Sequence, residues 1–137
     1  MINVFIVDDH QLVIEGIISF LQKEKDIKEA GYATTAMACL DFFKTNTADV
    51  ILMDINLPDM NGMDLCKLIK NNYSGVSVIA LSTLNQGSYI TQIIENGASG
   101  YLLKNADKDE ITEAIETVTT GKTFFSFEAG KIYKATT

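Results

Sequence analysis

Acidic residues stand at two places in the sequence from which carboxylates could converge on a cation. Asp8 and Asp9 directly follow the apolar run Ile2–Val7, and Asp54 follows the run Val50–Met53 in the same way. If these runs are neighbouring parallel strands, the three side chains meet at the sheet edge where α/β proteins bind ligands. Three anions so close together repel one another, so the arrangement calls for a cation. Magnesium, which prefers one or two carboxylates with waters and phosphate oxygens, fits this set.

Simpler interpretations of the same residues stay open at this point. Acidic residues often cap the helix that follows a strand, and two of the three could do so. His10, the only histidine, invites a phosphotransfer or metal role, but an exposed or helix-capping position is the better interpretation. Lys104 alone would be an ordinary solvated lysine, and only its place after the apolar run 100–103 gives it interest.

Strand-like apolar runs alternate with helical patterns five times along the chain. The predicted strands are 2–7, 27–33, 50–53, 76–81 and 100–103, of which the second is the weakest. The helical patterns lie within 11–24, 36–43, 65–69, 90–94 and 107–121. Gly97 and Gly121 are suited to end the last two helices, and Asp107 with Glu110 forms a box-like helix start. Such alternation predicts a parallel sheet with helices on both faces and right-handed crossovers, but not the order of the strands.

Composition narrows the class of protein. A length of 137 residues is typical of one domain. The net charge of −7 opposes direct binding to nucleic-acid phosphates. No apolar run is long enough for a membrane span, and the start lacks a signal-peptide pattern. Cys39 and Cys66 have no metal-site or redox spacing and are predicted to be reduced core thiols. We therefore expect a soluble, cytoplasmic protein without membrane contact.

Four motifs in order resemble the response-regulator receiver family of CheY-like domains. They are V-D-D-H at 7–10, L-M-D-I-N-L-P-D-M-N-G at 52–62, L-S-T at 81–83 and G-A-S-G-Y-L-L-K at 97–104. The resemblance spans residues 2–123. It implies a flavodoxin-like (βα)5 fold, which is a doubly wound, five-stranded parallel sheet of order 2-1-3-4-5. Residues 1–123 are then the receiver domain.

The resemblance also implies an acceptor and its metal ligands. Asp54 resembles the aspartate that takes a phosphoryl group. Asp8 and Asp9 resemble the acidic pair that holds Mg²⁺ together with Asp54, and Mn²⁺ could replace that ion. Asn56 resembles the residue whose main-chain carbonyl completes the protein ligands.

Three further residues resemble the family's phosphoryl-contact and switch positions. Ser82 resembles the hydroxyl residue that contacts the phosphoryl group; its neighbour Thr83 is less suitable because Ser82 keeps the family's separation from the lysine. Lys104 resembles the family's lysine, whose ammonium neutralises phosphoryl oxygens as a point charge. Tyr101 resembles the aromatic switch residue, although an ordinary edge-strand aromatic explains it about as well.

The implied function is that of a phospho-accepting switch rather than an ordinary enzyme. A sensor histidine kinase would phosphorylate Asp54 in a Mg²⁺-dependent step that the domain assists, as it assists dephosphorylation. The surface of the fourth helix, fifth strand and fifth helix would then change and control an output. The Y-L-L-K-x form at 101–105, the D-x-x-E start of the last helix at 107–110 and G-K-T-F-F-S at 121–126 are similar to NarL/LuxR-type regulators. In those regulators a helix-turn-helix DNA-binding domain follows the receiver. Residues 124–137 are then a tail or the start of a linker, and DNA binding and transcription control belong to the longer protein.

Two other function classes remain to be separated from this one. A magnesium-dependent phosphatase with an aspartate nucleophile usually carries D-x-D after its first strand and a large cap, whereas here the acids are adjacent. A receiver-like domain that binds partners without phosphorylation would keep the fold but not the chemistry. The sequence leaves open the cognate kinase, the output, the phosphoryl lifetime and dimerisation on activation.

Overall fold

The computed structural model describes residues 1–83 and 87–125 of the chain. Most of the predicted tail, residues 126–137, lies outside the described residues. The strands are β1 (Ile2–Val7), β2 (Ile27–Ala33), β3 (Val50–Asp54), β4 (Ser77–Ser82), β5 (Gly100–Leu103) and β6 (Phe124–Phe125). The helices are α1 (Gln11–Leu21), α2 (Ala36–Thr45), α3 (Gly62–Asn72), α4 (Gly87–Glu95) and α5 (Lys108–Val118).

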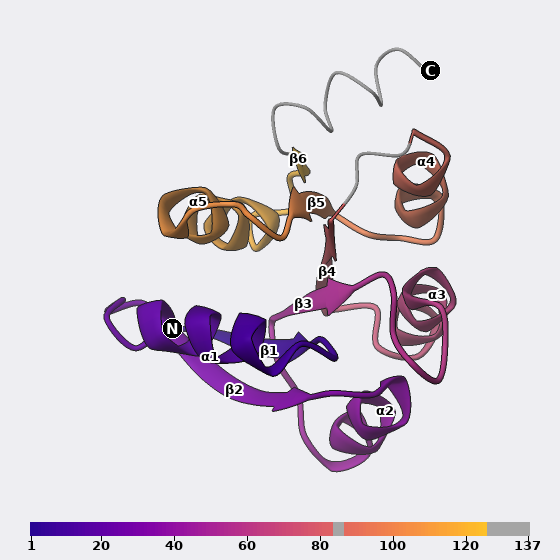
Figure 1. Cartoon of the computed structure of the whole chain (residues 1–137), viewed down its shortest axis with the longest axis horizontal. Coiled ribbons are helices and arrows are strands. Elements are labelled where there is room, and N and C mark those ends of the chain that lie inside the picture. The colour runs from indigo at the N-terminus through magenta and orange to yellow at the C-terminus, as the bar shows by residue number, and fades with distance from the viewer. Residues whose placement is uncertain (84–86, 126–137) are drawn as a thin grey trace.

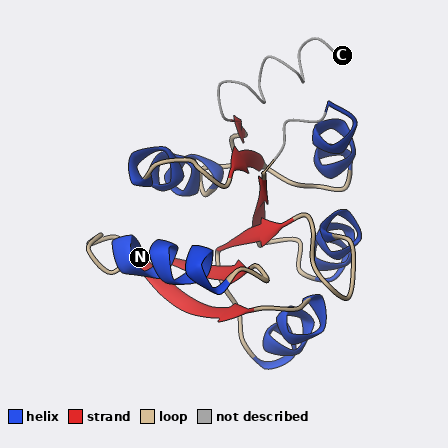
Figure 2. Ribbon diagram, in the orientation of Figure 1, coloured by secondary structure: helices blue, strands red, loops and turns tan. Residues whose placement is uncertain are grey.

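The strands form one sheet of order β2-β1-β3-β4-β5-β6, and every neighbouring pair is parallel. Figure 1 shows the sheet edge-on, with α1 and α5 on one face and α2, α3 and α4 on the other. The colouring by secondary structure in Figure 2 makes these three layers plain. The predicted flavodoxin-like fold and the predicted order of the first five strands are confirmed.

A sixth strand was not predicted. Phe124–Phe125 pairs in parallel with Gly100–Tyr101, so β5 is not the edge of the sheet. The amide N–H of Phe124 also donates to the carbonyl of Ser99 at 2.9 Å. Two residues are too few to show any periodicity, so this strand could not be predicted from the sequence.

Two apolar clusters, one on each face, hold the layers together. Buried side chains of α2, α3 and α4 pack on one face of the sheet, and those of α1 and α5 on the other. Strand β3 is buried at all five positions, which explains its continuous apolar run. Cys39 and Cys66 are free and buried, as predicted, and burial raises the pKa of each thiol to about 12.

The predicted helix boundaries are confirmed where caps define them. The Asp107 side chain accepts the N–H of Glu110 at 2.8 Å and so caps α5. Gly97 and Gly121 follow α4 and α5 with φ of 107° and 87°, the left-handed region that favours glycine. Among the described residues, no helix is both long and apolar enough to cross a membrane.

Candidate functional site

The strand register places the predicted acids side by side. Val7 pairs with Met53 across β1 and β3, so Asp8 and Asp54, each one position further along, are neighbours at the carboxyl end of the sheet. Ligand atoms of Asp8, Asp9, His10 and Asp54 lie within 4.8 Å of one another. The convergence of the three carboxylates, which the sequence could only predict, is therefore present in the fold.

Lys104 lies among these carboxylates. Its main-chain N–H donates to the carbonyl of Ser82 at 2.8 Å, which fixes the start of the β5–α5 connection beside β4. Its ammonium Nζ lies 3.0 Å from Asp54 Oδ2 and 3.2 Å from Asp8 Oδ2. Both carboxylates are almost completely buried, and the lysine side chain is only 9% exposed. Because these charges are shielded from water, they interact more strongly than an exposed ion pair does.

Burial is the main influence on the acidity of Asp54. It raises the pKa of this carboxyl to about 6, against the lowering effects of the Asn56 N–H and of Lys104, while the charge of Asp8 raises it further. The Asn56 N–H donates to Asp54 Oδ1 at 3.0 Å. At neutral pH the group is therefore largely ionised, with one oxygen hydrogen-bonded and the other beside the ammonium.

The donor set fits a hard divalent cation. Three carboxylates and one ammonium leave a formal charge of −2 at the cluster when His10 is neutral. Asp8 Oδ2 and Asp54 Oδ2 are buried and form ion pairs with the Lys104 ammonium. Among the described residues, no well-oriented hydrogen-bond donor faces either oxygen. Buried carboxylate oxygens without donors are costly, and a cation with oxygen ligands would satisfy them.

His10 contacts the site more closely than sequence reasoning suggested. Its ring is 57% exposed and it occupies the N-cap position of α1, as predicted, but its side chain makes no capping bond. Instead Nδ1 lies 2.8 Å from Lys104 Nζ, 3.0 Å from Asp8 Oδ1 and 3.2 Å from Asp9 Oδ1. A neutral ring that accepts from the ammonium satisfies the first contact. Only the adjacency of His10 to the acid pair could have signalled this role.

The two predicted switch residues contact each other. Ser82 ends β4 and is 3% exposed, whereas the neighbouring Thr83 is exposed. Tyr101 is completely buried in β5. Burial raises the pKa of the Tyr101 phenol, and a hydrogen bond with the Ser82 side chain opposes that effect. Since β5 is paired on both sides, Tyr101 is not an edge-strand aromatic.

The loop after β3 folds tightly back on Asp54. The N–H of Gly62 donates to the carbonyl of Ile55 at 2.7 Å, and Asn56 and Asn61 form an antiparallel bridge. A side chain on Gly62 would overlap the main-chain carbonyl of Asp54, which explains the glycine. The loop holds Asn56, which is exposed to solvent, next to Asp54.

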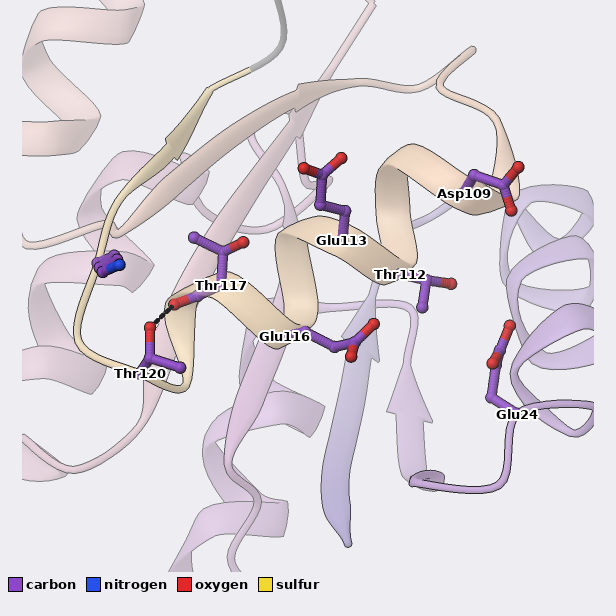
Figure 3. Close-up of a pocket in the computed structure, with 8 residues that line it drawn as sticks. Glu24, Asp109, Thr112, Glu113, Glu116, Thr117 and Thr120 are labelled. Atoms are coloured by element: carbon purple, nitrogen blue, oxygen red, sulfur yellow. Dashed lines mark hydrogen bonds between the residues drawn. The ribbon is translucent and has the colours of Figure 1, made fainter.

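A groove of about 620 Å³ lies elsewhere, along the outer face of α5. Figure 3 shows Asp109, Thr112, Glu113 and Glu116 along this helix, with Glu24 facing them from the segment after α1. None of the predicted site residues lines it. Its acidic lining is what a solvated helix face presents.

Comparison with known proteins agrees with this geometry. Residues 4–116 match the response regulator receiver domain. The transcriptional regulatory protein MctR of Rhizobium johnstonii is 38% identical over 125 residues, which are 91% of this chain and 58% of MctR. The response regulator UvrY of Escherichia coli is 34% identical over 92% of this chain and 58% of its own length. The chain thus spans little more than half of these relatives.

Solved structures support the same assignment. A LuxR-family two-component response regulator from Aurantimonas superposes with a TM-score of 0.92 at 23% identity, covering 99% of this chain and 97% of that one. The receiver domain of the response regulator NarL from Mycobacterium tuberculosis has a TM-score of 0.83 at 27% identity, covering 88% and 98%. The predicted similarity to the NarL/LuxR-type subfamily is confirmed. The chain belongs to the response regulator receiver domain family.

Proposed function

We propose that the chain is the phospho-accepting switch of a two-component phosphorelay, in which a sensor histidine kinase phosphorylates Asp54. The observation that carries this proposal is the buried Asp54 carboxylate at the edge of a rigid sheet, in contact with the Lys104 ammonium, which also contacts the buried Asp8 carboxylate. Nucleophile, acids and lysine all lie at carboxyl ends of strands, where the sheet can hold them in place.

Asp54 is the proposed nucleophile. One of its carboxylate oxygens attacks the phosphorus of a phosphohistidine or a small acyl phosphate and forms an acyl phosphate bond. The bond from phosphorus to the donor's nitrogen or oxygen breaks, and the donor keeps that electron pair. Because a carboxylate is a weak nucleophile, the reaction depends on positioning and on neutralising the phosphoryl oxygens. Hydrolysis of the product, assisted by the same groups, would reset the switch.

The surrounding residues supply the neutralising charge. Lys104 already contacts both buried carboxylates, and its flexible stem allows its ammonium to follow a phosphoryl oxygen. Asp8 and Asp9, with Asp54 and the main-chain carbonyl of Asn56, are the proposed ligands of Mg²⁺ or Mn²⁺. When bound, the cation supplies positive charge opposite the transferred phosphoryl group.

Ser82 and Tyr101 form the proposed switch. Their hydrogen bond links Ser82, the residue proposed to contact the phosphoryl group, to a buried ring in β5. If Ser82 turns its hydroxyl toward those oxygens, this bond breaks and Tyr101 can shift, which alters the surface of α4, β5 and α5. Phosphorylation can shift the equilibrium between the two conformations of the domain only by the difference between its interaction free energies with them.

The output is proposed to be transcription control by a DNA-binding domain outside these 137 residues. Two observations support it: curated relatives such as MctR are transcriptional regulators, and this chain spans only 58% of that protein. Homodimer formation on activation belongs to the same proposal, since RcsB, a solved neighbour, forms dimers bound to DNA. The proposed setting is the cytoplasm, where a histidine kinase obtains its phosphoryl group from ATP.

Incubation with acetyl phosphate and Mg²⁺ tests the function directly. Intact-mass measurement should show one added phosphoryl group per chain, which is lost at low metal and in Asp54→Asn. A matched control is Asp41→Asn, which changes an exposed aspartate on α2 that is paired with Lys44. It should label like the wild type.

Other outcomes would assign the chain to a different class. Turnover of many acetyl phosphate equivalents per chain at a rate comparable with true hydrolases would indicate a phosphatase. A folded wild type that takes no label from acetyl phosphate or from any histidine kinase tested would indicate a binding domain without phosphorylation. Against the phosphatase stands the short connection from β1 to α1, which leaves only Asp8, Asp9 and His10 between them and so no room for a substrate cap.

A further inference from the structure

Asp59 connects the loop that follows the acceptor to a different helix. It lies in the outer part of the β3–α3 loop, between Asn56 and Asn61, which bridge at the loop's base. Its carboxylate accepts the N–H of Ala36 at 2.8 Å and the N–H of Met37 at 3.0 Å. These are free amides in the first turn of α2, which need acceptors from outside the helix.

The helix already has a cap of its own. The Thr35 hydroxyl accepts the N–H of Ala38 at 3.1 Å. Asp59 is therefore an additional acceptor, supplied from more than twenty residues further along the chain. The two bonds lower the pKa of the Asp59 carboxyl, so it is anionic at the positive end of α2 at neutral pH.

The junction that Asp59 holds is also hydrogen-bonded to the backbone of Asp8. The main-chain N–H of Asp8 donates to the carbonyl of Ala33, the last residue of β2, at 3.0 Å. Ala36, which begins α2, follows three positions later. The β2–α2 junction thus binds the backbone of Asp8 on one side and the loop that carries Asn56 on the other. A change at Asp59 would alter how that loop lies relative to the acids.

We propose that Asp59 is a positioning residue of the cation site, which fixes the β3–α3 loop against α2 and so sets the affinity for Mg²⁺. The inference rests on the proposed function, because it assumes that the acid cluster binds Mg²⁺. Asp59 itself does not ligate the ion. It acts through the loop, in the way that outer partners orient metal ligands elsewhere.

Calorimetric titration of the full chain with MgCl₂ tests this role. Asp59→Ala should bind Mg²⁺ about tenfold more weakly, the lower end of the usual loss when an orienting partner is removed. Asp59→Asn keeps an oxygen that can accept one of the two amides, so its affinity should lie between those of Asp59→Ala and the wild type. At saturating Mg²⁺, labelling of Asp54 by acetyl phosphate should recover in both variants, because the nucleophile and Lys104 are unchanged.

Thr35→Ala is the matched control, since it removes a cap from the same helix end without releasing the loop. Its Mg²⁺ affinity should stay within about twofold of the wild type. The inference is overturned if Asp59→Ala binds Mg²⁺ like the wild type, or if Thr35→Ala weakens binding as much. In either case a wild type that binds Mg²⁺ and labels on Asp54 leaves the proposed function standing. A wild type without Mg²⁺ binding refutes both.

Discussion

At the scale of single residues, the site is a set of buried charges that only partly balance. Asp8 and Asp54 lie almost completely out of contact with water, and one lysine stands between them. Such an arrangement is unfavourable for the folded state without a bound cation, because desolvated carboxylates repel. Function and stability should therefore oppose each other here, and changes at these residues should show it.

Asp54→Asn should stabilise the metal-free protein at neutral pH. The pKa of Asp54 is about 6 in the folded chain against 3.8 for an unperturbed aspartate. As pH rises between these values the unfolded state loses its proton first, so the stability of the fold falls and stays low above about pH 6. At roughly 1.4 kcal/mol per pKa unit, the asparagine variant should be more stable by on the order of 1–3 kcal/mol at about pH 7.

Urea denaturation with a chelator present, at about pH 7 and about pH 3.5, measures this difference. It should be small at the lower pH, where the aspartate is mostly protonated in both states, and saturating Mg²⁺ should reduce or reverse it by stabilising the wild type. An equal difference at both pH values would show that ionisation of Asp54 is not its cause.

Lys104→Met should separate phosphoryl transfer from cation binding. Loss of the ammonium removes the positive charge that would neutralise the phosphoryl oxygens during transfer. Labelling by acetyl phosphate should therefore slow by about 10²-fold, as when a transition-state hydrogen-bond donor is deleted. Mg²⁺ affinity should hold or rise, because the ammonium is a positive neighbour 3.0 Å from Asp54. Lys44→Met, at an exposed lysine, is the control. Weaker Mg²⁺ binding in Lys104→Met would contradict the assignment of the lysine to the phosphoryl group.

At the scale of helices and strands, the elements that are most completely buried were the easiest to predict from the sequence. The strands β1 and β3 read as continuous apolar runs that end at acids, so both the sheet and the site could be located. Strand β2 is buried only at its two ends, Ile27 and Ala33, which left a weak signal. Two contacts, that of Asp59 with α2 and that of His10 with Lys104, could not be predicted. Nothing in the sequence pairs Asp59 with a helix that begins 23 positions earlier, and a single histidine next to two acids does not reveal its contact with Lys104.

Gly62→Ala should show how little space the β3–α3 loop has beside Asp54. An added methyl group would overlap the Asp54 carbonyl and come within 2.6 Å of Ile55 Cα. Both neighbours are main chain and cannot move aside, so we expect a loss of about 2–4 kcal/mol in unfolding free energy, with weaker Mg²⁺ binding.

Gly16→Ala provides the contrast for this change. Gly16 lies inside α1, and nothing stands within 4 Å of an added methyl group. Alanine should therefore stabilise the chain by about 0.5–1 kcal/mol through helix propensity. Chemical denaturation of both variants compares them. Similar effects of the two substitutions would mean that close approach in the β3–α3 loop does not explain Gly62.

At the scale of the whole molecule, the acidic charge of the domain bears on what it can bind. The net charge of −7 and the acidic groove on α5 (Figure 3) oppose direct contact with DNA phosphates by this domain. Under the proposed function, DNA binding would require a separate basic module, and the signal would have to pass from the strand ends to that module. The sheet is the part of the domain that reaches from the acid cluster to β5 and β6 (Figure 1).

The contribution of the sixth strand to the fold can be tested by truncation. The boundary of the receiver at residue 123 stays a prediction; just beyond it, Phe124 and Phe125 pair with β5 and pack against opposite clusters of the core. A chain that ends at residue 123 should be about 2 kcal/mol less stable than one that ends at 125, because two partly buried phenylalanines and a strand pairing are lost. Urea denaturation of the two chains isolates this step. Equal stability would mean that β6 adds nothing to the fold. A measurable loss would show that the pairing of β6 with β5, the strand that carries Tyr101, contributes to the stability of the fold.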